Sequence, residues 1–351
     1  MKTGYGAAVL YGYSNAYVKA IEAKLISKST MQNITNAKDV PSILSILINT
    51  DYKKYLEDFG GMNIATGMID FVLSKNLGES IDKLASITPL VKKKIMLTYI
   101  AKWDLYNIKL SLEAKDRMQT HAAVSKYLVN TKFYNSIFIK QAMEETANVE
   151  DLMTKYLINS PYKQIIQRGL EIYKKNHNIL EVNIELDKAY YDNISKILFV
   201  LRNEDYNVYL IIKYEIEMRN IINLLRAKRN NLEFEQIKEF IIKNGFSDEN
   251  KLMNMFESSK SIQELAQQID RFDLKQVLDI YEKTNNLLYF EIKIKNTIFE
   301  ISNKFLRHSV LCFGTIFEYM YLKEIEVSML RIIVKAVEYN LNKTELSSML
   351  I

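Results

Sequence analysis

The chain has 351 residues, a formal net charge of +5 and 48% hydrophobic residues, but only 10 glycines and 3 prolines. This length is sufficient for about two or three domains with sizeable cores. The scarcity of Gly and Pro argues against the many tight turns of a β-protein, and the interspersed charges argue against a nucleic-acid binder, which gathers its basic residues into one stripe. Long runs with apolar residues at helical spacing predict an all-α fold. Two short basic runs, residues 92–94 and 226–229, are typical of solvated helix faces or of contacts to a helix C-terminus.

The N-terminal residues, MKTGYGAAVLYGYSNAY, lack the continuous apolar core of a signal peptide. The most apolar stretch, residues 309–322, is interrupted by Glu318 and is shorter than the ~20 residues that a membrane-spanning helix needs. We therefore expect no secretion signal and no membrane-spanning segment. The single cysteine, Cys312, rules out an internal disulfide and fits a reducing compartment.

One block of sequence returns twice at nearly constant spacing. Residues 38–56 read KDVPSILSILINTDYKKYL, residues 148–166 read NVEDLMTKYLINSPYKQII, and residues 260–278 read KSIQELAQQIDRFDLKQVL. The three align without a gap, and their first positions, 38, 148 and 260, are almost evenly spaced. Chance similarity between amphipathic helices would explain one such pair, but a second series with the same period favours an internal repeat.

The second series consists of WDLYNIKLSL at residues 103–112, IEMRNIINLL at 216–225 and IEVSMLRIIV at 325–334. Together the two series predict three copies of one helical unit. The expected domains are residues 1–115, 116–230 and 231–351. A period of this length is too long for a tetratricopeptide or ankyrin repeat, whose units have about 33 to 34 residues.

Each copy places one acid among apolar residues of a predicted helix: Asp104, Glu217 and Glu326. An unpaired buried carboxylate is costly, so each is expected to meet a lysine, an arginine or free N–H groups at a helix end. An internal ion pair that fixes how helices cross is favoured over direct binding of a partner. Equivalent acids at equivalent positions also predict pseudo-three-fold packing around a central axis.

Residues that would carry catalysis or bind a cofactor are scarce. The glycine-containing stretch GGMNIATG, residues 60–67, has no lysine to reach a phosphate. His121, His177 and His308 lie far apart in the sequence, outside any metal-binding motif. His308 and Cys312 are four residues apart and could share a helix face, but two ligands do not make a zinc site. We therefore expect no catalytic residues, no cofactor and no metal.

Residues 11–27, YGYSNAYVKAIEAKLIS, resemble the N-terminal signature of the C subunit of the prokaryotic V-type and A-type rotary ATPases, a relative of the d subunit of the eukaryotic V-ATPase. The segments WDLYNIKLSL, EIEMRNIINLLRAK and EIEVSMLRIIVKA resemble the three repeated acidic helices of that family. The resemblance covers essentially the whole chain. One departure is Tyr17, where the family pattern has an arginine, so a charged contact at that position is in doubt.

The resemblance implies a funnel-shaped body of three similar helical domains in the central stalk of the rotor, at the cytoplasmic face of the membrane. Such a subunit is not catalytic. It forms a socket between the shaft subunits D and F and the membrane proteolipid ring, and so couples ATP hydrolysis or synthesis to proton or sodium transport. The alternative is a free-standing all-helical scaffold that binds soluble protein partners.

Overall fold

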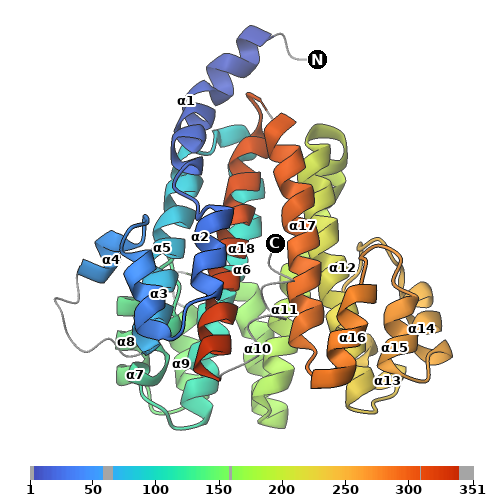
Figure 1. The fold of residues 1–351 in the computed structure, drawn as a ribbon. Helices are drawn as coiled ribbons and strands as arrows, with labels where there is room; N and C mark the ends of the chain where they lie inside the picture. Colours follow the sequence, from blue (N-terminus) through green and yellow to red (C-terminus); the bar gives the residue numbers. More distant parts are fainter. Residues whose placement is uncertain (1–3, 58–65, 158–159, 309, 340–351) are drawn as a thin grey trace. The chain divides into compact units, whose positions relative to one another are not determined.

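The computed structural model describes residues 4–57, 66–157, 160–308 and 310–339 (Figure 1). Throughout these residues the regular structure is helical and no strand occurs, which confirms the predicted all-α fold. Within the same ranges, no helix is both long enough and apolar enough to cross a bilayer. Most of the glycine-containing stretch at 60–67 lies outside the described residues.

The chain divides into two compact units. Unit 1 comprises residues 1–24 and 44–197, and unit 2 comprises residues 25–43 and 198–351. The chain therefore passes from one unit to the other three times, and unit 2 contains segments from both halves of the sequence. The three domains predicted from the repeat stay a prediction.

Unit 1 contains most of the helices of the first half of the chain. Its elements are α1 (Gly4–Glu22), α4 (Lys53–Glu57), α5 (Thr66–Ile87), α6 (Leu90–Asp116), α7 (His121–Val124), η1 (Ser125–Tyr127), α8 (Ser136–Glu145), α9 (Val149–Leu157), α10 (Lys163–Asn176) and residues 179–197 of α11 (Ile179–Glu204). Pro89 separates the long helices α5 and α6, since its ring lacks the N–H that would continue α5. A Cβ atom at Gly78 of α5 would lie 2.6 Å from the carbonyl oxygen of Asn130, so only glycine lets the two backbones approach this closely.

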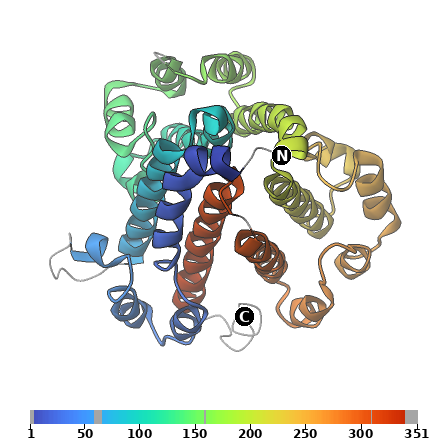
Figure 2. The ribbon, with the colours of Figure 1, turned by 90° about the horizontal axis from the view of Figure 1, so that it is seen from above.

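Unit 2 is built around three long helices. Its elements are α2 (Lys28–Thr35), α12 (Tyr206–Arg229), α13 (Phe234–Ile237), η2 (Lys238–Phe240), α14 (Glu249–Ser258), α15 (Ile262–Gln267), α16 (Lys275–Thr284), α17 (Leu288–His308) and α18 (Phe313–Glu338), while α3 (Val40–Leu47) and α11 run across the division between the units. Helix α17 packs against both α12 and α18 (Figures 1 and 2). Helix α18 is buried along almost its whole length.

The segments that follow α6 and α12 contain the same series of short elements. Helices α7, η1, α8 and α9 begin at positions 121, 125, 136 and 149, and α13, η2, α14 and α15 begin at 234, 238, 249 and 262, so each pair has the same spacing. The side-chain contacts recur at that spacing: Asn107 Oδ1 accepts a hydrogen bond from the Val129 N–H at 3.0 Å, and Asn220 Oδ1 accepts one from the Ile242 N–H at 2.8 Å. These matching contacts support the predicted repeat.

The lysines at the ends of the two long helices also match. Lys115 donates to the carbonyl oxygens of Met143 and Thr146 near the end of α8. Lys228, the lysine at the equivalent position of α12, donates to the carbonyl oxygens of Phe256 and Ser259 at 2.7 and 2.9 Å. Cations are favoured at this end of a helix, where the last carbonyl groups have no partner within the helix.

In helix α18 the corresponding contact is made by residues from near the N-terminus of the chain. The backbone N–H of Ile26 donates to Glu326 Oε2 at 2.6 Å, although 300 residues separate the two in sequence. Ser27 caps α2, and its Oγ accepts a hydrogen bond from the Thr30 N–H at 3.1 Å. Residues just before α2 therefore contact the acid of α18 as residues just before α14 contact the acid of α12.

Candidate functional site

The three repeated acids are buried on the long helices α6, α12 and α18. Asp104, Glu217 and Glu326 are only 5%, 3% and 5% exposed. Burial at this level requires hydrogen-bond donors or an opposite charge for each carboxylate. The three carboxylates receive different donors.

Asp104 is held by two hydroxyl groups. Thr131 Oγ1 donates to Oδ1, and the Tyr162 hydroxyl donates to Oδ2 at 2.6 Å. Burial raises the pKa of Asp104, and the hydrogen bonds from Thr131, Tyr162 and the Tyr134 backbone offset only part of that rise. Burial and the adjacent Asp104 carboxylate also raise the pKa of the Tyr162 hydroxyl, so this group stays a donor.

Glu217 is held mainly by backbone. Its Oε2 accepts from the N–H groups of Phe246 and Ser247 at 2.8 and 3.0 Å, and its Oε1 accepts from Ser247 Oγ at 2.6 Å. A Cβ atom at Gly245 would lie 2.8 Å from Glu217 Oε2, so glycine is needed for the loop to wrap the carboxylate this closely. The loop between η2 and α14 is thereby fixed to α12.

Glu326 is held by a cation. Lys323 Nζ lies 2.7 Å from Glu326 Oε1, and both side chains are almost completely buried. The ion pair lies within one helix turn, and the Ile26 N–H provides the contact outside α18. The sequence favours an ion pair for all three acids; the partners described for Asp104 and Glu217 are instead hydroxyl and backbone N–H groups. The structural role of the three acids stays a prediction.

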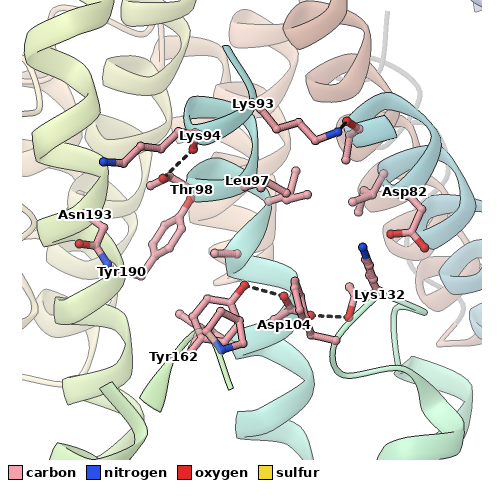
Figure 3. A pocket seen from close by; sticks show the side chains of 18 of the residues that line it. Asp82, Lys93, Lys94, Leu97, Thr98, Asp104, Lys132, Tyr162, Tyr190 and Asn193 are labelled. Atoms are coloured by element: carbon pink, nitrogen blue, oxygen red, sulfur yellow. Dashed lines mark hydrogen bonds between the residues drawn. The ribbon is translucent and has the colours of Figure 1, made fainter. Parts of the chain in front are cut away.

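A large cleft opens beside Asp104 within unit 1 (Figure 3). Its volume is about 1120 Å³, and helices α5, α6 and α11 and the loops at residues 131–133 and 161–162 line it. The Asp104 and Tyr162 side chains meet at its base. Most of the lining is apolar, which is usual for binding sites. It is therefore the strongest candidate for a binding site among the described residues.

Three lysines stand in the walls of the cleft. Lys94 and Lys132 are exposed, whereas Lys93 is half-buried and donates to the carbonyl oxygen of Ala85. Burial, and to a smaller extent the nearby charge of Lys132, lower the pKa of Lys93. The sequence left two interpretations of residues 92–94 open, and contact to a helix C-terminus is confirmed for Lys93, because Ala85 lies in the last turn of α5. Lys92 is only 7% exposed, and the other two line the cleft.

The remaining sequence-predicted positions lie apart from the cleft. His308 ends α17 and Cys312 precedes α18, so the two residues do not share one helix. In the part of the chain that the structure describes, no three His, Cys, Asp or Glu side chains converge to hold a metal ion. Tyr17 stands where the resemblance led us to expect an arginine. Its ring makes a cation–π contact with Lys83, whose ammonium lies 4.8 Å from the ring centroid.

These features define a class of protein: an all-α chain of paired long helices whose buried carboxylates hold the loops between them. A model of the family described as ATP synthase (C/AC39) subunit matches residues 14–349, so the chain belongs to that family. The prediction of this family from the sequence is confirmed.

Individual relatives match over similar lengths. The C subunit of the A-type ATP synthase of Thermococcus onnurineus is 26% identical over 333 residues, which cover 93% of this chain and 86% of that protein. The same protein of Methanosphaera stadtmanae is 25% identical over 335 residues, covering 93% and 83%. That of Methanocaldococcus jannaschii is 23% identical over 346 residues, covering 97% and 86%.

Proposed function

We propose that the chain is a non-catalytic subunit of the central rotor of a V/A-type ATPase. It joins the shaft subunits D and F to the membrane proteolipid ring, so that ATP hydrolysis or synthesis is coupled to proton or sodium transport. The subunit lies at the cytoplasmic face of the membrane as a peripheral part of the complex. The observation that carries this proposal is the family match from residue 14 to residue 349.

The internal construction of each unit supports a mechanical role. Buried acids hold loops to long helices through short hydrogen bonds, as Glu217 does with Phe246 and Ser247. Helix α18 is buried along most of its length and carries a buried ion pair. Close-packed interiors of this kind have low compressibility and transmit strain. A body built in this way is suited to pass torque without a catalytic step of its own.

The proposal includes three similar helical domains with boundaries near residues 115 and 230. The contacts of Asn107 and Lys115, which return at Asn220 and Lys228, support the first two copies. The hydrogen bond from Ile26 to Glu326 supports a third copy that is completed by residues preceding and including α2.

The test is affinity purification of the tagged chain from detergent-solubilised membranes, with co-purifying proteins quantified by mass spectrometry. Catalytic-head, shaft and proteolipid subunits, with one copy of this chain per complex, are the expected result. A chain recovered without these partners, even after crosslinking, would contradict the proposal and favour the free-standing helical scaffold.

A further inference from the structure

The cleft of unit 1 exposes apolar side chains that a folded chain normally buries. Leu97 on α6 is 41% exposed, and Phe133 is 45% exposed. Leu90, at the start of α6, is 90% exposed and continues the same lining. Contiguous exposed apolar surface with a polar rim marks a site of interaction.

The charges around the cleft favour an acidic occupant. Lys93, Lys94 and Lys132 line the cleft together with two carboxylates, Asp82 and Asp104. Asp104 already accepts hydrogen bonds from two hydroxyl groups, and Asp82 interacts with the charge of Lys132. The three lysines still outnumber the two carboxylates of the lining. An incoming carboxylate would offset this excess of positive charge, because opposite charges within a few ångströms favour each other's ionised forms.

The size and the distribution of polar groups favour a protein helix over a lipid. A helix is about 10–12 Å wide with its side chains and rises about 1.5 Å per residue, so about 1120 Å³ accommodates roughly two turns. Polar groups occur on several walls, with Thr98 on α6, Asn193 on α11 and Lys132 on the loop (Figure 3). An acyl chain needs an unbroken apolar track, with the cations gathered at one end.

Unit 2 covers the corresponding aromatic residue with its own side chains. Phe246 occupies the position of the repeat that is equivalent to Phe133, and the guanidinium of Arg271 lies 3.8 Å from the centroid of its ring. Tyr214 packs on the same ring at 4.7 Å between centroids. Over the Phe133 ring, the ammonium of Lys132 lies 6.0 Å from the centroid. The same position of the repeat is therefore covered within the chain in unit 2 and open in unit 1.

We propose that the unit 1 cleft docks the end of an amphipathic helix from a partner subunit. The helix places apolar side chains on Leu97 and Phe133 and at least one Asp or Glu opposite Lys94 and Lys132. This assignment rests on the proposed function only in requiring that the chain works inside an assembly. Its occupant is defined by chemistry: an acidic, apolar-faced helix of roughly two turns.

The test places the photocrosslinker p-benzoylphenylalanine at Leu97 of the full chain, expressed within its native complex. Irradiation is followed by mass spectrometry of the crosslinked peptides. A matched control carries the crosslinker at Leu180, which is 58% exposed in the same unit and outside the cleft lining. The expected product at Leu97, and not at Leu180, is one partner peptide with acidic residues and helical apolar spacing.

Charge reversal then tests the role of the lysines. The double variant Lys94→Glu, Lys132→Glu is expected to lower the Leu97 crosslink at least tenfold. The exposed pair Lys174→Glu, Lys175→Glu at the end of α10 makes the same change of net charge and is expected to leave the crosslink unchanged. Thermal unfolding of each variant verifies that the unit remains folded.

Several outcomes would overturn the proposal. One is a complex that assembles with all its subunits but gives no Leu97-specific crosslink, which would leave the proposed function intact. A crosslink to phospholipid would assign the cleft to the membrane instead. A partner peptide without acidic residues, or an equal loss of crosslink in the Lys174 and Lys175 control, would remove the electrostatic basis.

Discussion

Phe133 in unit 1 and Phe246 in unit 2 occupy the same position of the predicted repeat, yet their surroundings differ. Arg271 and Tyr214 cover the Phe246 ring, whereas Phe133 stands 45% exposed at the edge of a cleft. The hydrogen-bond donors to the neighbouring buried acids differ as well. Backbone N–H groups wrap Glu217, while the donors to Asp104 include side-chain hydroxyl groups at the base of the cleft. One scaffold thus supports a closed site and an open one, which implies that the open site is the one available to a partner.

The largest expected effect is on the closed site. Glu217→Ala removes the acceptor of two backbone N–H groups and one hydroxyl, and is expected to lower the free energy of unfolding by about 3 kcal/mol. Urea unfolding of the purified chain measures the change. Glu235→Ala, at a side chain that is 76% exposed, is the control and is expected to change little. A loss for Glu217→Ala no larger than that of the control would show that the loop is not held through this carboxylate.

A pair of matched substitutions compares the two aromatic positions directly. Phe246→Ala is expected to cost about 2 kcal/mol, because it removes the ring between Arg271 and Tyr214. Phe133→Ala is expected to cost no more than about 0.5 kcal/mol in the isolated chain, since the ring is largely exposed. Thermal unfolding under identical conditions ranks the two variants. Equal losses would mean that Phe133 is packed as firmly as Phe246 and that the sites do not differ.

The smallest expected effect is a dependence of the folding stability on pH, caused by Asp104 at the open site. Burial raises the pKa of Asp104 above its ordinary value of 3.8, so the folded chain binds its proton more tightly than the unfolded chain does. The resulting stabilisation is present below pH 3.8 and is lost as the pH rises through the folded pKa. Relative to Asp104→Asn, the wild-type chain should therefore become less stable as the pH is raised from about 4 towards 7.

Urea unfolding of the wild-type chain and of Asp104→Asn across this pH range measures the difference in stability, in which the contributions of the other titrating groups largely cancel.

Glu291 in unit 2 is expected to give the opposite dependence on pH. Burial acts to raise its pKa, but the charges of Lys295 and Arg226 outweigh burial and lower it. Its stabilisation is present above its ordinary pKa of 4.5 and is lost on acidification, so Glu291→Gln should give the opposite slope. If the stability difference between wild type and Asp104→Asn changed with pH in the same direction as that between wild type and Glu291→Gln, the environments assigned to Asp104 and Glu291 would be contradicted.

Local sequence patterns predicted much of this fold. Helical spacing of apolar residues predicted the long helices, and the period shared by the two repeat series marked Asp104 and Glu217, two acids that the structure buries. Such patterns could not predict the hydrogen-bond donors to these acids. Thr131 and Ser247 reach the acids through loops whose path depends on the packing of several helices. The sequence could not decide between a solvated face and contact to a helix C-terminus for residues 92–94, because only the packing of α5 beside α6 brings the Ala85 carbonyl oxygen to Lys93.

The contact between Ile26 and Glu326 has a consequence for how the chain is made. During synthesis the segment before α2 leaves the ribosome 300 residues ahead of its partner on α18. At translation rates of about 5–20 residues per second, that interval is roughly 15 to 60 s. Unit 1 has all its residues well before α18 is translated, whereas unit 2 does not. During that interval residues 25–43 have no partner on α18, so their native contacts there form only after the chain is almost completely synthesised.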